Sequence, residues 1–102
     1  MLERIVKFER SKTKHKKYAA YIQNRMTRKI HKLNFGDNRY QQYKDSTPLK
    51  LYRKLNHGSQ KRMRNYFNRH SGIANREKAI AYEKRKSNGK YTPKLLSHIY
   101  LW

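Results

Sequence analysis

The chain has 102 residues, of which 27 are Lys or Arg and only six are Asp or Glu, so its formal net charge is +21. It contains no Cys, which excludes disulfides, cysteine-based zinc sites and thiol nucleophiles. Its length, and the scatter of its two Pro and four Gly, predict one small basic domain over residues 1–102.

The positive charge is spread along the chain and is not confined to a tail. Residues 1–35 carry 11 Lys or Arg against two acids, residues 36–58 carry five against two, and residues 59–102 carry 11 against two. Like charges at this density repel one another, so we expect an anionic partner. No apolar run approaches the length of a membrane span, and the start, MLERIVKFERSK, lacks the apolar core of a signal peptide. We therefore expect no membrane span.

Residues 1–36 predict a three-stranded antiparallel meander. The segments RIVKFE, KKYAAYIQ and KIHKLNF are rich in β-branched and aromatic residues and are separated by the polar segments SKTKHK and NRMT. Gly36 ends the third strand in a turn that suits Asp37 and Asn38. The predicted buried face consists of Ile5, Val6, Phe8, Tyr18, Ala20, Ile22, His31, Leu33 and Phe35.

Residues 47–102 predict three to four short helices. Thr47 followed by Pro48 is typical of a helix start, and that helix should run to Gly58; Ser59 and Gly72 should bound a second helix. Asn75 should cap a third helix through REKAIAYEKRK, and Thr92 followed by Pro93 should begin the last one. The tyrosines on the apolar sides of these helices, Tyr52, Tyr66 and Tyr82, are assigned to the core. The fold class is therefore α+β.

Catalytic patterns are weak in this sequence. The six carboxylates show no acid/base pair, and there is no phosphate-binding glycine loop. Asp37 and Asp45 are better explained as braces for the turn after Phe35. Asn56, His57, Asn65 and His70 faintly resemble the His and Asn content of HNH nucleases, but many nearby cations oppose metal binding. We expect no enzyme, cofactor, metal or small-molecule substrate, and keep an HNH-like nuclease as a distant alternative.

Basic side chains in loops and at helix ends carry the functional signal, because such positions are free to meet an anionic partner. Tyr40 and Tyr43 lie outside any apolar stripe, so stacking on bases and packing in the protein are equally open for them. The candidate binding residues are Lys12, Lys14, Lys16, Lys17, Arg25, Arg28, Lys29, Arg62, Arg64, Arg69, Lys84, Arg85 and Lys86.

Several motifs in a fixed order carry a family resemblance. These are LNFGD, then Tyr40, Tyr43 and Asp45, then RMRNYFNRH, and finally LLSHIYLW. In this order they resemble a group of small, basic, uncharacterised proteins of nucleocytoplasmic large (giant) double-stranded DNA viruses. The resemblance covers residues 30–70 and 94–102, and residues 71–90 depart from it. It implies no activity, but it implies a viral setting and a place in the virus particle.

Together these observations predict a non-enzymatic basic structural protein of the virion, present in host cytoplasm or nucleus during assembly. Its expected partner is the DNA backbone, bound without sequence specificity, because nothing resembles a helix-turn-helix, zinc finger, homeodomain or RNA-recognition signature. The alternative is a minor capsid or cement protein that contacts acidic capsid proteins.

Overall fold

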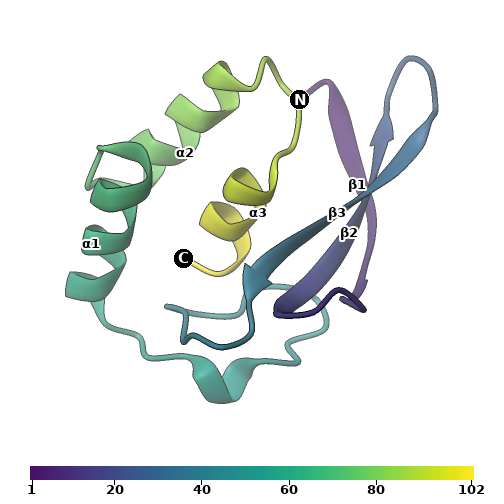
Figure 1. The fold of residues 1–102 in the computed structure, drawn as a ribbon. Helices are drawn as coiled ribbons and strands as arrows, with labels where there is room; N and C mark the ends of the chain where they lie inside the picture. The colour runs from purple at the N-terminus through teal and green to yellow at the C-terminus, as the bar shows by residue number, and fades with distance from the viewer.

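A computed structural model describes all 102 residues and shows an α+β fold. The first 37 residues form a three-stranded antiparallel sheet of β1 (Glu3–Arg10), β2 (Lys16–Asn24) and β3 (Ile30–Asp37), in the order β1-β2-β3. The meander predicted from the alternating apolar residues is confirmed. Figure 1 shows the helices gathered on one side of this sheet, while no helix covers its other face.

The buried face of the sheet centres on the middle strand. Tyr18, Ala20 and Ile22 of β2 are fully buried and pack with Phe35 of β3, while Ile5, Phe8 and Leu33 are partly buried around them. Two predicted core residues are wrong: Val6 is 44% exposed and His31 is exposed.

Each exception has a physical reason. The pairing of β1 with β2 shifts register between Ile5 and Lys7, and such an irregularity leaves Val6 out of the regular alternation of faces. His31 lies near the start of the edge strand β3, where burial is low and rises only toward Phe35. That end of the β2–β3 hairpin projects beyond the helices (Figure 1).

The segment between sheet and helices differs most from expectation. The helix predicted to begin at Thr47 does not form, and only a 3-10 turn, η1 (Arg53–Leu55), interrupts the loop. The Thr47 hydroxyl still accepts a hydrogen bond from the Lys50 amide at 3.2 Å, as a helix cap would. However, Lys50 has a φ of 48°, which ends any right-handed helix after one turn.

Three helices complete the chain, and their predicted starts are confirmed. They are α1 (Gln60–Ser71), α2 (Arg76–Lys86) and α3 (Pro93–Tyr100). The side chains of Ser59, Asn75 and Thr92 each accept a hydrogen bond from the amide three residues further on, which is the geometry of an N-cap. Gly72 ends α1 with a φ of 70°.

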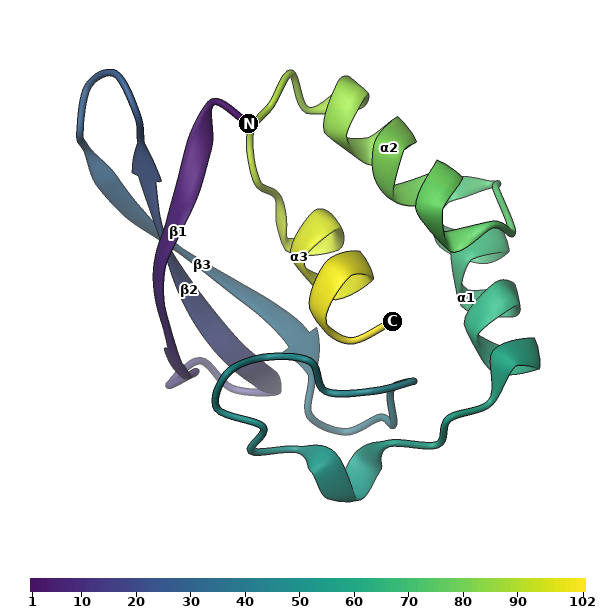
Figure 2. The ribbon, with the colours of Figure 1, turned by 180° about the vertical axis from the view of Figure 1, so that it is seen from behind.

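The elements stack in layers. In the two opposite views, Figures 1 and 2, α3 lies between the sheet and the α1–α2 pair, and it contacts both β3 and α2. Leu95, Leu96 and Leu101 are buried there. Tyr66 is buried and Tyr52 packs against the core, whereas Tyr82, also assigned to the core, is 36% exposed on α2. None of the helices has the length and apolar character that crossing a membrane requires.

Candidate anion-binding site

The carboxylates leave the positive charge almost unneutralised. The two ion pairs within 4.0 Å join Lys7 to Glu9, and Arg39 to Asp37. The other carboxylates mostly accept from neutral groups: Glu3 from the Tyr91 amide, and Glu83 from the Ser71 hydroxyl. Asp37 is therefore the one carboxylate paired with an Arg, and the surface stays strongly cationic.

The predicted basic residues divide between opposite ends of the sheet. Lys12 and Lys14 lie in the β1–β2 loop at one end, whereas Arg25, Arg28 and Lys29 lie at the β2–β3 turn at the other. The C-terminal end of α2, with Lys84, Arg85 and Lys86, approaches that second end, because Leu2 hydrogen-bonds both Gly89 and Arg25. Arg62, Arg64 and Arg69 are exposed along α1.

A small basic cleft marks the second end. It is lined by Arg4, Gln23, Arg25 and Arg28 and contains no hydrophobic residue. The Arg4 guanidinium donates to Gln23 Oε1 at 2.9 Å, and no carboxylate lines the cleft. Arg4 is a site residue that the sequence reasoning missed, although its position beside Ile5 in a strand places it on the outer face.

Lys17 was predicted as a free loop cation, and this prediction is wrong. It lies inside β2 and is only 2% exposed. Its stem passes over Gly36, and its Nζ donates to the Tyr40 carbonyl at 3.0 Å. Burial lowers the pKa of Lys17 to about 8, although the charges of Asp37 and Asp45 act in the opposite direction.

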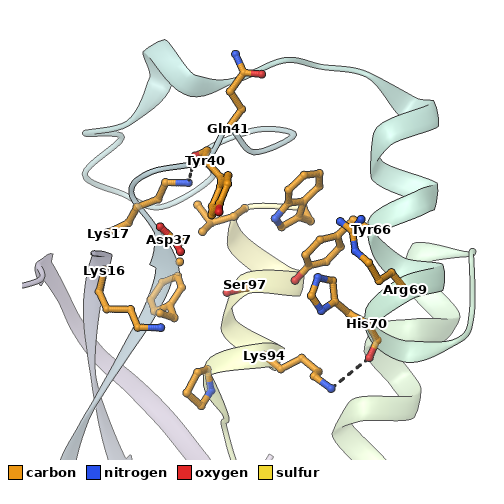
Figure 3. Close-up of a pocket in the computed structure, with 15 residues that line it drawn as sticks. Lys16, Lys17, Asp37, Tyr40, Gln41, Tyr66, Arg69, His70, Lys94 and Ser97 are labelled. Carbon is orange, nitrogen blue, oxygen red and sulfur yellow. Dashed lines mark hydrogen bonds between the residues drawn. The ribbon is translucent and has the colours of Figure 1, made fainter. Parts of the chain in front are cut away.

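A larger pocket of about 480 Å³ lies beside Lys17, between β3, α1 and α3 (Figure 3). Four basic side chains line it: Lys16 and Lys17 from β2, Arg69 from α1 and Lys94 from α3. The one acidic lining residue, Asp37, accepts two hydrogen bonds from the Arg39 guanidinium, at 3.0 and 2.7 Å. These bonds hold the pKa of Asp37 well below its usual range. The lining is therefore net positive.

One wall of the pocket is built from stacked aromatic rings. The Tyr66 and Trp102 rings are parallel with centroids 4.2 Å apart, His57 lies 5.2 Å beyond Trp102, and His70 lies 4.4 Å from Tyr66. His57 and His70 thus lie at opposite ends of this stack. No group of three or more His, Asp or Glu residues is arranged so that it could hold a metal ion.

The two tyrosines that the sequence left open have different surroundings. Tyr40 is 64% exposed and lines the pocket, with the Arg39 guanidinium 5.7 Å from its ring centroid. Tyr43 is half-buried and packs edge-on against His57 at 6.1 Å. Of the two, only Tyr40 is available to stack on a ligand.

A network of buried hydrogen bonds fixes the position of the aromatic wall. His98 is fully buried, and its two ring nitrogens lie 3.0 Å from the Tyr66 hydroxyl and 2.8 Å from the Ser71 hydroxyl. Ser71 in turn donates to Glu83 at 3.0 Å. Burial lowers the pKa of His98 to about 4, so it is neutral at pH 7 and can satisfy both neighbours. This network fixes Tyr66 and thereby the pocket wall.

Two pocket residues escaped the sequence reasoning. Lys94 follows Pro93 at the start of a helix, and its Nζ donates to the His70 carbonyl at 3.2 Å, which joins α3 to α1 (Figure 3). His70, named from the sequence only for the nuclease alternative, is exposed at the pocket. Neither has a local sequence signal, because the pocket forms only when distant segments meet.

Comparison with protein families, with curated proteins and with solved structures finds no match to this chain.

Proposed function

We propose that this chain is a non-enzymatic basic structural protein that binds the DNA backbone without sequence specificity, within the particle of a large DNA virus. The viral setting rests on the resemblance of its motifs. The binding activity rests on the physical chemistry of its surface.

The observation that carries this proposal is the cationic surface that remains after every internal partner has been counted. The net charge is +21, and two ion pairs use Lys7 and Arg39 alone. Exposed cations occupy both ends of the sheet and the length of α1, so a polyanion is attracted from several directions. The sequence carries no helix-turn-helix, zinc-finger, homeodomain or RNA-recognition signature, which favours contacts to phosphate.

Salt dependence provides the test. If about six to eight basic side chains meet phosphates, the logarithm of the binding constant should fall against the logarithm of salt concentration with a slope of about −5 to −7. Binding to duplexes of unrelated sequence should be equal within error. Fluorescence anisotropy of labelled DNA over a range of NaCl concentrations measures both quantities.

Matched variants make the test specific. Lys14→Gln and Arg85→Gln, at opposite ends of the molecule, should each reduce the size of the slope by about one. Thr13→Ala, a neutral change in the same loop as Lys14, should leave it unchanged. A protein that fails to bind DNA even at low salt would contradict the proposal.

A second candidate, a minor capsid or cement protein, is favoured by exposed apolar side chains near the same sheet edges. Met26 is 81% exposed, Ile30 54% and Val6 44%, and β1 and β3 are both edge strands. Apolar groups add nothing to phosphate binding but suit a protein surface. Binding to acidic capsid protein, with no binding to DNA at low salt, would select this candidate.

A further inference from the structure

The pocket between β3, α1 and α3 differs from the basic cleft at the other end of the sheet because aromatic rings line it together with basic side chains. Its volume of about 480 Å³ lies within the range of about 300–1,000 Å³ that is usual for small-molecule sites. Extended DNA backbone does not require such a hollow, since exposed side chains on a convex surface reach phosphates equally well. DNA backbone binding therefore does not account for the pocket, and its volume suits a small ligand.

Positive charge lines the pocket without a matching anion. Lys16, Arg69 and Lys94 reach it from three separate elements, and no carboxylate lies within 4.0 Å of any of them. The one lining carboxylate, Asp37, is already occupied by Arg39. A phosphate group entering this space would meet several charge-assisted donors at once.

Lys17 adds a buried and incompletely satisfied cation. An ammonium group has three hydrogen-bond donors, and the single acceptor of Lys17 Nζ is the Tyr40 carbonyl at 3.0 Å. It is 98% shielded from solvent, and the nearby charges of Asp37 and Asp45 do not form an ion pair with it. A buried charge without a counter-charge is unfavourable, so an anion in the adjoining pocket is stabilised.

Besides these cations, the pocket offers an exposed aromatic ring, that of Tyr40. Figure 3 shows its ring beside the same space that Lys16, Arg69 and Lys94 surround. The faces of Tyr66 and Trp102 are already occupied by each other and by His70 and His57. Tyr40 is thus the tyrosine of the lining that stays exposed, with the Arg39 guanidinium 5.7 Å from its ring centroid. Every nucleobase has a π-face that can stack on such a ring.

We propose that this pocket binds a nucleoside phosphate, with the phosphate among Lys16, Arg69 and Lys94 and the base against Tyr40. The ligand is either a free nucleotide or the phosphorylated end of a nucleic acid strand, because both present the same chemistry. Arg69 also belongs to the cationic surface proposed above to bind DNA, but the pocket assignment does not depend on DNA binding.

The test uses the tryptophan that the pocket itself provides. Trp102 is the sole Trp of the chain and lines the pocket, so its fluorescence reports occupancy directly. Titrations with AMP, ribose 5-phosphate, adenosine and inorganic phosphate should give the tightest saturable change with AMP. Tyr40→Ala should weaken AMP binding by about tenfold and leave ribose 5-phosphate unchanged.

The matched charge control lies on the same helix. Arg69→Gln removes a lining cation and should weaken AMP binding by about tenfold, whereas Arg64→Gln removes an exposed α1 cation outside the pocket and should not. Both should reduce nonspecific DNA binding equally. Circular dichroism and the urea midpoint of unfolding verify that each variant is folded.

The outcomes separate the two proposals and the two ligand sources. Three results would each overturn the pocket assignment, whether or not the protein binds DNA. These are the absence of a saturable fluorescence change with AMP, an equal loss of AMP affinity in Arg69→Gln and Arg64→Gln, and binding of inorganic phosphate as tight as that of AMP. AMP binding without DNA binding supports the pocket and overturns the backbone proposal. A 5′-phosphorylated oligonucleotide that binds more tightly than its 5′-hydroxyl form, in competition with AMP, identifies a strand end; equal binding of the two identifies a free nucleotide.

Discussion

Asp45 is the residue on which the loop after the sheet depends. It is 1% exposed, and its carboxylate accepts from the Tyr18 hydroxyl, from the Thr47 amide and hydroxyl at 3.0 and 2.7 Å, and from the Tyr52 amide at 3.1 Å. Burial acts to raise the pKa of Asp45, but the hydrogen bonds from Thr47 and Tyr18 outweigh it and lower the pKa. The charge is therefore retained and satisfied by neutral donors.

We predict that Asp45→Asn destabilises the protein by about 2–3 kcal/mol. The amide group keeps the shape but replaces one acceptor oxygen with a donor, which leaves buried donors without acceptors. Urea unfolding measures the loss. Ser46→Ala, at the exposed neighbouring position, should change stability by no more than about 0.5 kcal/mol. Equal midpoints for Asp45→Asn and the native protein would show that the network contributes nothing.

His98 predicts a specific dependence of stability on pH. Its pKa is lowered from an ordinary value of 6.5 to about 4, mainly by burial; the charge of Glu83 opposes this shift, and the charges of His70, Lys94 and Arg76 add to it. Between pH 4 and pH 6.5, His98 is protonated in the unfolded chain but neutral in the folded chain. The stability contributed by neutral His98 is therefore complete above pH 6.5 and is lost as the pH falls toward 4.

Urea unfolding at a series of pH values measures this effect. His98→Gln should flatten the dependence of unfolding free energy on pH between 6.5 and 4, even if the variant is less stable throughout. His31→Gln, at an exposed position, should leave the dependence intact. An unchanged slope in His98→Gln would assign the titration to other groups.

The behaviour of single residues was predictable only where it followed from local alternation. Tyr18 and Phe35 were correctly placed in the core, since every second residue of a strand faces one side. The same rule could not reveal that Lys17 is buried, because this depends on the loop around Tyr40 folding over it. Long-range contacts of this kind leave no mark in the neighbouring sequence.

Among the elements, the close approach of β3 to α3 depends on Gly36. Its φ is 77°, and a Cβ built there would lie 2.8 Å from Leu101 Cδ1 and 3.2 Å from Lys17 Cβ. Any side chain would therefore force apart the layers that form the floor of the pocket. Gly72, at the end of α1, has a similar φ of 70° but nothing within 4 Å of a built Cβ.

This pair of glycines separates backbone strain from crowding. Gly72→Ala should cost about 1 kcal/mol, the ordinary penalty for a left-handed conformation. Gly36→Ala should cost about 2–3 kcal/mol, because overpacking adds to the same penalty. Chemical denaturation of the two variants in parallel gives the comparison. Equal losses would mean that Leu101 and Lys17 move aside freely.

Helix starts show how far local signals reach. Ser59, Asn75 and Thr92 each begin a helix as predicted, because a capping side chain and the following apolar face suffice to define one. Thr47 carries the same signal, yet no α-helix follows. There the Leu51 amide donates to the Tyr18 hydroxyl and the Tyr52 amide to Asp45, so tertiary hydrogen bonds replace those of a helix. A capping residue therefore predicts the first turn of a helix, but whether the helix continues depends on tertiary contacts.

The whole molecule has a small buried core and a surface on which positive charge predominates. The principal extents are 40 × 29 × 20 Å. The screening length in water is about 30 Å at 0.01 M salt and about 10 Å at 0.1 M. At low salt most charges therefore repel one another across the entire protein, whereas at moderate salt each interacts only with its neighbours. Screening, or a bound polyanion, removes much of this repulsion.

We therefore predict that the melting temperature rises by several degrees as NaCl increases from about 0.01 to 0.2 M, with little further change above that range. Differential scanning calorimetry measures the rise. A triple variant, Lys12→Glu, Lys14→Glu and Arg85→Glu, lowers the net charge by two at each position and should reduce the rise in proportion. Because all three side chains are exposed and distant from the core, packing is unaffected. A salt-independent melting temperature in the native protein would mean that repulsion is already relieved within the chain, and the need for an anionic partner would disappear with it.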